Sequence, residues 1–276
     1  MMRSYLLTIA YDGTGYAGWQ RQDGFDTVQE RLECAAAVLA GEAVVVHGAG
    51  RTDAGVHALR QAAHVRLQWR RTTAELLRAL NGNLPRDIVV LAVRPVPAAF
   101  HARFSARGKR YLYRFAMSSV RPVLARGYYH WVRGGLDLPA MRAAAAQLVG
   151  RHDFASFASN PGYERSRGTV RRIQHLHLVR RPHGIDLVVQ GDGFLYNMVR
   201  TIAGTLRDVG LGRKTPAGVG EILRACDRRR AGATLEPGAL YMVRVLYRPE
   251  DLAMDDRTAT CGTIRYDPEN AMMRSE

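Results

Sequence analysis

The sequence predicts an α+β protein in which two ferredoxin-like (RRM-like) units with mainly antiparallel sheets join side by side, leaving a cleft between them. Three observations predict this fold. The first half alternates strand and helix patterns in the order β-α-β-β-α-β, the second half resembles a longer version of that order, and Pro95 and Pro97 break the chain between them. We therefore expect an N-terminal unit over residues 1–100, a C-terminal unit over 101–250 and a terminal extension over 251–276.

Six elements are predicted in the first half. Apolar residues at helical spacing follow a capping-box pattern at Thr27 and Glu30, and a second box occurs at Thr72 and Glu75. β-branched and alternating apolar residues indicate the strands. The predicted elements are a strand over 5–11, a helix over 28–39, strands over 43–47 and 61–69, a helix over 72–80 and a strand over 88–93.

The second half contains a hairpin between two helical regions. Asp137 and Pro139 mark the start of its first helix, and Pro182, His183 and Gly184 form the hairpin turn. The extension shows no clear periodicity, so we expect it to be loosely packed. The predicted elements are a strand over 110–117, a helix over 138–149, strands over 170–180 and 185–190, helices over 194–209 and 216–225, and a strand over 241–247.

The charge points to a polyanionic partner. The chain of 276 residues has a formal net charge of +15, and of its 40 Lys and Arg residues only Lys109 and Lys214 are lysines. A GC-rich genome would explain arginine in place of lysine, but not the excess of cations over acids, so the charge favours nucleic-acid binding. The three cysteines lack zinc or disulfide spacing, and no apolar run is long enough for a membrane helix, so we expect a cytoplasmic protein.

Several motifs favour ordinary structural roles. The G-x-G-x-x-G match over 13–18 lacks a helix beginning inside it, which a dinucleotide site requires. The pair His175 and His177 has no nearby acid or cysteine to complete a metal site. Tyr111, Tyr113 and Phe115 alternate on one strand face, so they fit a hydrophobic core better than a base-stacking surface, although one of them could line a cleft.

The loop "GRTDAGVHA" (50–58) is the strongest functional candidate. A lone aspartate in a glycine turn is usually structural, but here Arg51 lies two residues from Asp53, and flanking glycines allow close approach to a ligand. A nearby guanidinium favours the ionised carboxylate, which can act as a nucleophile or a base. Arg51 could also fill the gap left by an extruded base. Arg200, in an otherwise apolar helix, requires an anionic partner or a surface position.

This loop resembles the signature of the TruA family of tRNA pseudouridine synthases, and the resemblance spans roughly residues 5 to 248. Five further segments resemble that family in the same order. They are "YDGTGYAGWQRQ" (11–22), "TVQERLE" (27–33), "NLPRDI" (83–88), "FHARFSARGKRYLYR" (100–114) and "GFLYNMVRTIAGTL" (193–206).

The resemblance implies conversion of uridine to pseudouridine in the anticodon stem-loop of tRNAs, at positions 38, 39 and 40, without a metal or cofactor. It implies that Asp53 is the catalytic aspartate, in an active-site cleft between the units. Tyr111 would contact the target base and take up the C5 proton, Arg200 would pair with Asp53 across the cleft, and Arg51 would hold the extruded nucleotide. It also implies a homodimer. It assigns no role to the segment 159–168 or to the extension.

Two other classes of function stay open at this stage. An RNA-binding module without activity would use Asp53 only to cap a turn. A carboxylate-based hydrolase, such as a nuclease, usually needs two or more acids around a metal, and no clear second carboxylate accompanies Asp53.

Overall fold

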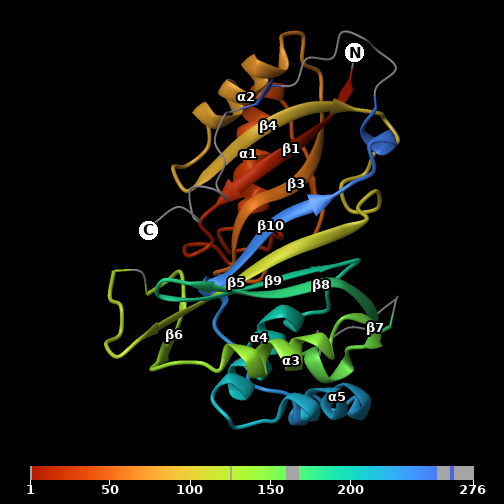
Figure 1. The fold of residues 1–276 in the computed structure, drawn as a ribbon. Helices are drawn as coiled ribbons and strands as arrows, with labels where there is room; N and C mark the ends of the chain where they lie inside the picture. The colour runs from red at the N-terminus through yellow and green to blue at the C-terminus, as the bar shows by residue number, and fades with distance from the viewer. Residues whose placement is uncertain (1, 125, 160–167, 254–261, 264–276) are drawn as a thin grey trace. The chain divides into compact units, whose positions relative to one another are not determined.

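The computed structural model describes residues 2–124, 126–159, 168–253 and 262–263. The described chain has five α-helices and a mixed, mostly antiparallel set of strands, so the predicted α+β class is confirmed. It forms two compact units, Met1–Arg107 with Met242–Glu276, and Gly108–Tyr241 (Figure 1). No helix in the described ranges is both long and apolar enough to cross a membrane.

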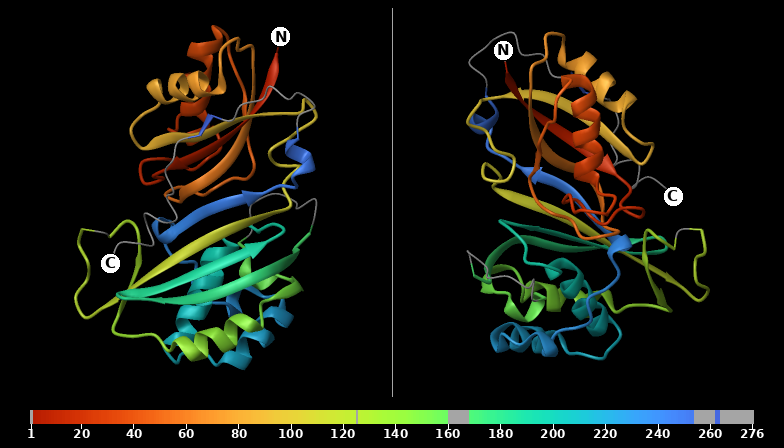
Figure 2. Two further views of the ribbon diagram at one scale, coloured as in Figure 1. Left: turned by 45° about the horizontal axis from the view of Figure 1, so that its top comes forward. Right: turned by 180° about the vertical axis from the view of Figure 1, so that it is seen from behind.

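The first unit is a sheet covered by two helices. Its strands run in the order β11-β4-β1-β3-β10, and β2 also pairs with β3. The two helices lie on one face of this sheet (Figure 2). The elements are β1 (Arg3–Tyr11), α1 (Val28–Ala40), β2 (Val46–Gly48), β3 (His57–Leu67), α2 (Thr73–Gly82), β4 (Ile88–Val96), β10 (Leu240–Leu246, which begins in the other unit) and β11 (Gly262–Thr263).

Helix α1 starts where predicted but is capped differently. The predicted box at Thr27 and Glu30 is wrong, because the Thr27 side chain makes no cap hydrogen bond and its Oγ1 is buried without a partner in the described structure. The backbone supplies the cap instead, since the N–H groups of Val28 and Gln29 donate to the carbonyls of Gly18 and Trp19, at 3.2 and 3.0 Å. The box between Thr72 and Glu75, which starts α2, is confirmed.

Strand β4 continues past the predicted break. Pro95 lies inside it opposite Tyr5 of β1, and the strand ends at Val96. Proline is tolerated there because β11 pairs only with Ala92 and Val93, so Pro95 lies beyond the part of the edge that β11 covers. Strand β11 belongs to the extension 251–276, most of which lies outside the described residues, so the expected loose packing of the extension stays a prediction.

The second unit is a sheet with helices α3, α4 and α5 on one face (Figure 1). Within it the strand order is β5-β9-β8-β7, and β6 runs parallel to β5. The predicted hairpin is confirmed as β8 and β9. The elements are β5 (Gly108–Ser118), β6 (His130–Arg133), α3 (Leu138–Ala146), β7 (Gly150–Asp153), β8 (Val170–Arg181), β9 (Gly184–Gly191), α4 (Met198–Gly210) and α5 (Pro216–Ala225).

Helix α4 begins later than predicted. Asn197 precedes it in the left-handed conformation, with φ of 62°, so residues 194–197 form a turn instead of helix. Tyr111, Tyr113 and Phe115 are all buried, so the core interpretation of these aromatic residues is confirmed. Short 3-10 helices lie at Ala155–Phe157, Arg228–Arg230, Pro237–Ala239 and Glu250–Leu252. Residues 160–167 of the segment 159–168 lie outside the described part of the chain.

Candidate active site

Asp53 lies at the tip of a closed turn between β2 and β3. The Val56 N–H donates to the Asp53 carbonyl at 3.1 Å, and Gly55 in this turn has φ of 77°. Only glycine adopts that φ without strain, which explains the residue type at position 55. Where the loop begins, the Gly50 carbonyl accepts from the Gln61 side chain at 2.9 Å. The backbone around Asp53 is therefore fixed on both sides, and its side chain is half-buried.

The glycine-rich segment 13–18 packs against this loop. The Trp19 N–H donates to the Thr52 carbonyl at 3.1 Å, and the Gly55 N–H donates to the Tyr16 carbonyl at 3.3 Å. Gly18 has φ of 101°, and a Cβ there would lie 2.6 Å from the Thr52 oxygen. Gly13 and Gly18, two glycines of the G-x-G-x-x-G match, therefore allow close backbone packing against the Asp53 loop.

Buried polar side chains hold the residues on either side of Asp53. The Tyr11 hydroxyl lies 2.8 Å from Thr52 Oγ1, and burial raises the pKa of Tyr11 to about 12, so the phenol stays protonated. On the other side of the turn, His57 Nδ1 accepts from the Gly13 N–H at 3.0 Å. Asp12 Oδ1 lies 3.1 Å from the same nitrogen, but it already accepts two hydrogen bonds from Thr14.

Helix α1 holds the segments that lead into the loop. The Glu33 carboxylate accepts from Arg21 at 3.0 Å and from the Val46 N–H of β2 at 3.1 Å. The Gln29 amide donates to Glu33 and to the Val46 carbonyl, both at 3.0 Å, and its oxygen accepts from the Arg21 N–H. These bonds give the "TVQERLE" segment a structural role, which is to position β2 and residues 19–21 around the Asp53 loop.

Arg51 is exposed on the same loop. Its Nε donates to Gln20 Oε1 at 3.2 Å, so its side chain extends toward the segment that follows Gly18. Arg51 and Asp53 thus lie on one fixed loop, as the sequence predicts. An exposed guanidinium on this loop can bind phosphate or stack on a nucleobase.

Tyr111 and Arg200 lie in the second unit. Tyr111 is on β5, where its side chain is 7% exposed and packs edge-to-face on Phe194 with ring centroids 5.1 Å apart. Arg200 is in the first turn of α4, where its Nε donates to the Leu235 carbonyl at 2.6 Å and its Nη1 donates to Asn197 Oδ1 at 2.8 Å. Two neutral acceptors therefore fix the direction of this guanidinium. Its pairing with Asp53 stays a prediction.

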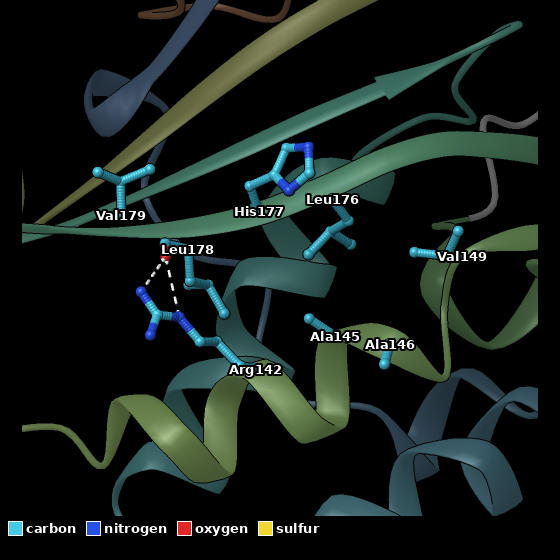
Figure 3. A pocket seen from close by; sticks show the side chains of 8 residues that line it. All are labelled: Arg142, Ala145, Ala146, Val149, Leu176, His177, Leu178 and Val179. Carbon is cyan, nitrogen blue, oxygen red and sulfur yellow. Dashed lines mark hydrogen bonds between the residues drawn. The ribbon is translucent and has the colours of Figure 1, made fainter.

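A groove in the second unit does not hold the predicted residues. It has a volume of about 520 Å³ and lies between α3 and β8 (Figure 3). Its lining is largely apolar and includes no carboxylate, and the Arg142 guanidinium donates to the Leu178 carbonyl through Nε and Nη2. Its ionisable side chains are Arg142 and His177, and none of the four predicted site residues lines it.

Comparison with known proteins decides the family. A sequence profile described as tRNA pseudouridine synthase matches residues 7–105 and 144–248. The chain belongs to the tRNA pseudouridine synthase family. It is therefore an isomerase of the family that converts uridine to pseudouridine. The matched ranges contain Arg51, Asp53 and Arg200, whereas Tyr111 lies between them.

Relatives of this pseudouridine synthase cover nearly its whole length. A protein of Caldicellulosiruptor bescii is 42% identical over 246 residues, which are 89% of this chain and 100% of the relative. One of Rhodospirillum rubrum is 43% identical over 253 residues, covering 91% and 90% of the two chains. One of Methylococcus capsulatus is 41% identical over 248 residues and covers 90% of each. All three are named tRNA pseudouridine synthase A.

Sequence reasoning on this pseudouridine synthase missed the residues that hold the Asp53 loop. Tyr11, Gly13 and Gly18 lie in the "YDGTGYAGWQRQ" segment, and Thr52 and His57 belong to the loop segment itself. Their roles depend on contacts across more than 30 positions of the chain. The sequence offered one indication of these contacts, which is that segment 11–22 and the loop segment 50–58 both resemble the same family.

Proposed function

We propose that this pseudouridine synthase isomerises uridine in the anticodon stem-loop of tRNAs, at positions 38, 39 and 40, and that Asp53 is its catalytic residue. The observation that carries the proposal is the fixed turn at Asp53. Its neighbours Thr52 and Val56 are bonded or packed against Tyr11, Gly18 and Gly13. A fixed backbone at Asp53 supports this role, because a reaction at a single sugar carbon requires an accurately placed carboxylate.

The chemistry needs a carboxylate at the sugar. The N1–C1′ bond breaks, the uracil turns over, a C5–C1′ bond forms, C5 loses its proton and N1 gains one. Asp53 either attacks C1′ and is later displaced, or abstracts the 2′ proton to give a glycal to which that proton returns. In both routes the carboxylate acts on positive character at the sugar. We assign proton removal from C5 to Tyr111, orientation of Asp53 to Arg200, and support of the extruded nucleotide to Arg51.

The charge of the chain supports a tRNA substrate. A net charge of +15 provides the counterion-releasing contacts that dominate affinity for a phosphate backbone. In the described residues no group of three or more His, Cys, Asp or Glu side chains could hold a metal ion. We propose a reaction without metal or cofactor, in which the carboxylate and the tRNA alone supply the reacting groups.

The finer description of fold and assembly also belongs to the proposal. The order β4-β1-β3-β2 and the two helices on one face support a ferredoxin-like first unit, and we propose a ferredoxin-like fold for the second unit as well. We further propose that the protein acts in the cytoplasm as a homodimer, so that one tRNA can contact both subunits.

Nucleoside analysis tests this function directly. Unmodified tRNA transcript is incubated with the purified protein, digested and analysed by mass spectrometry, with and without EDTA. We expect pseudouridine at positions 38–40 in both reactions. Binding without pseudouridine would support the RNA-binding module. Strand cleavage that EDTA stops would support the nuclease.

A further inference from the structure

Four aromatic rings, none of them among the four predicted site residues, form a contiguous cluster in the first unit. Phe104 and His101 have ring centroids 4.3 Å apart, and His101 lies 4.7 Å from His64. His64 stacks on His47 with centroids 4.9 Å apart and planes 22° apart. These rings, which we call the ring ladder, connect β2, β3 and the segment after β4.

The outer end of the ring ladder is open to solvent. Phe104 at this end is 73% exposed and His47 at the other end is exposed as well, whereas His64 between them is buried. The Phe104 ring projects from a hydrogen-bonded turn. The Ser105 N–H donates to the His101 carbonyl at 2.9 Å, and the His101 N–H donates to Ser105 Oγ at 3.3 Å. The backbone that carries the exposed ring is therefore fixed.

Ring nitrogens of His64 and His101 also bind the backbone of that turn. His64 Nδ1 accepts from the Ala102 N–H at 3.1 Å, and His101 Nδ1 accepts from the Arg103 N–H at 3.2 Å. These nitrogens are consequently occupied by backbone donors, and the imidazoles lie against one another through their faces and edges. A shared metal ion would need nitrogen lone pairs that converge on one point, so the ring ladder does not fit a metal site.

The surroundings of the ring ladder are cationic. The Arg103 guanidinium lies 5.8 Å from the centroid of Phe104. The charged groups that act on His64 and His101 are Arg66, Arg103 and the other histidines of the cluster. An open aromatic ring beside exposed arginines is the combination with which proteins bind unpaired nucleotides, since the ring stacks on the base and the arginine contacts its phosphate.

We propose that Phe104, backed by His101, stacks on an unpaired base of the RNA substrate, while Arg66 and Arg103 contact the adjacent phosphates. The proposal rests on the proposed function for its substrate and adds a binding surface outside the reacting groups. The occupant is RNA and not a second protein chain, because the apolar area is a single ring and its rim is positively charged.

Fluorescence anisotropy with a labelled, unmodified anticodon stem-loop and with full tRNA transcript tests the surface. The Asp53→Asn protein is the background, so that no turnover occurs during the measurement. Phe104→Leu keeps an apolar side chain but removes the π face, and we expect it to raise Kd about 5- to 30-fold, in keeping with the loss of one base stack. Phe104→Tyr keeps the ring and should stay within about twofold.

Two further variants separate stacking from charge. Arg103→Gln should reduce the slope of log Kd against log salt by about 0.7 to 0.9, as expected for one lost phosphate contact, whereas Phe104→Leu should leave the slope unchanged. Val38→Ala, which removes exposed apolar surface from α1, should match wild-type affinity. Because Phe104 is exposed, the unfolding temperature of Phe104→Leu should equal that of wild type.

The two proposals fail in different ways. Wild-type Kd in Phe104→Leu, together with normal pseudouridine formation by the protein with Asp53 intact, would overturn the stacking surface alone. A shift in sedimentation of Phe104→Leu with unchanged RNA affinity would overturn it in favour of contact with a second copy. Loss of affinity in Phe104→Leu, with no pseudouridine formed by wild type, would support the surface and reject the proposed function.

Discussion

Gly18 and Thr52 lie so close together that a β-carbon on Gly18 would come within 2.6 Å of the Thr52 carbonyl oxygen. This contact joins the glycine-rich segment 13–18 to the loop that contains Asp53. It places the residue before Asp53 directly on the glycine-rich turn. The position of the carboxylate therefore depends on the absence of a side chain at position 18.

Gly18→Ala should displace the Asp53 loop. The added methyl group has no space, and φ of 101° is unfavourable for alanine, so we expect a loss of roughly 2 kcal/mol in the free energy of unfolding and at least a tenfold fall in kcat. Gly15→Ala is the matched control, because a Cβ at Gly15 meets nothing within 4 Å. Urea unfolding and pseudouridine formation check both variants. Equal behaviour of the two would contradict the role given to Gly18.

Asp53→Asn should abolish pseudouridine formation while tRNA Kd stays within about threefold. The amide has the same shape but carries no negative charge to stabilise or capture the sugar, and a loss of at least about 10³-fold in rate is expected. Single-turnover assays and anisotropy with the same tRNA measure the two properties. Conversion retained by Asp53→Asn would remove this residue from the reaction.

Tyr111→Phe should slow conversion by at least about 10²-fold, because it removes the phenol that we assign to proton transfer. The ring remains against Phe194, and the loss of one buried hydroxyl changes the free energy of unfolding by only about 1 kcal/mol. Tyr113→Phe on the same strand is the control. It removes a hydroxyl that donates to the Glu236 carbonyl at 3.1 Å and should leave turnover near wild type. A similar loss of rate in both variants would indicate a structural effect on β5.

Arg200→Lys should reduce kcat by at least tenfold with little effect on KM. A lysine ammonium cannot reproduce the planar fork whose Nε and Nη1 bind Leu235 and Asn197, so the direction of the charge is lost although its sign is kept. Arg229→Lys, at a side chain 91% exposed in its ion pair with Asp227, is the control and should behave as wild type. An active Arg200→Lys enzyme would restrict this arginine to a structural role.

His64 should make the stability of the protein sensitive to pH. Burial first, and then the neighbouring His101, His47 and Arg66, lower the pKa of His64 to about 4. His64 therefore takes up a proton near pH 6.5 in the unfolded chain but only near pH 4 in the folded protein. The contribution of neutral His64 to the free energy of unfolding is complete above pH 6.5 and is lost as the pH falls toward 4.

Urea unfolding at pH 7.5 and pH 5.0 measures this effect. Between these values His64 should contribute a loss of about 2 kcal/mol. His64→Asn keeps an acceptor for the Ala102 N–H but does not titrate, so its loss should be smaller than that of wild type by this amount. An equal loss in the two proteins would show that the pH dependence arises elsewhere.

Local signals in the sequence predict most of the regular structure. The predicted helix 216–225 coincides with α5, and the turn at Pro182–Gly184 correctly marks the hairpin of β8 and β9. An error arises where backbone groups from another segment make the hydrogen bonds that a local sequence pattern predicts for a side chain. Carbonyls of Gly18 and Trp19 cap α1 in place of Thr27.

The candidate site likewise contains residues that the sequence predicts and contacts that it does not. The loop with Arg51 and Asp53 is recognisable because its residues are contiguous, and the buried face of Tyr111 follows from the period of two in β5. Contacts such as Tyr11 with Thr52 depend on strands that meet only after folding. The ring ladder brings together residues 47, 64, 101 and 104, and no spacing along the chain indicates that they meet.

Arg142 has a consequence for how the protein behaves in a crowded cell. Beyond Ile173, no described strand lies on the outer side of β8, and the Arg142 guanidinium occupies the Leu178 carbonyl there (Figure 3). Another polypeptide strand that added to this edge of β8 could not donate to the Leu178 carbonyl, which already accepts from Arg142. It would also lie against the Arg142 guanidinium, with Arg180 and Arg181 nearby on the strand. The same bond that orients a helix side chain thus opposes amyloid-like self-association.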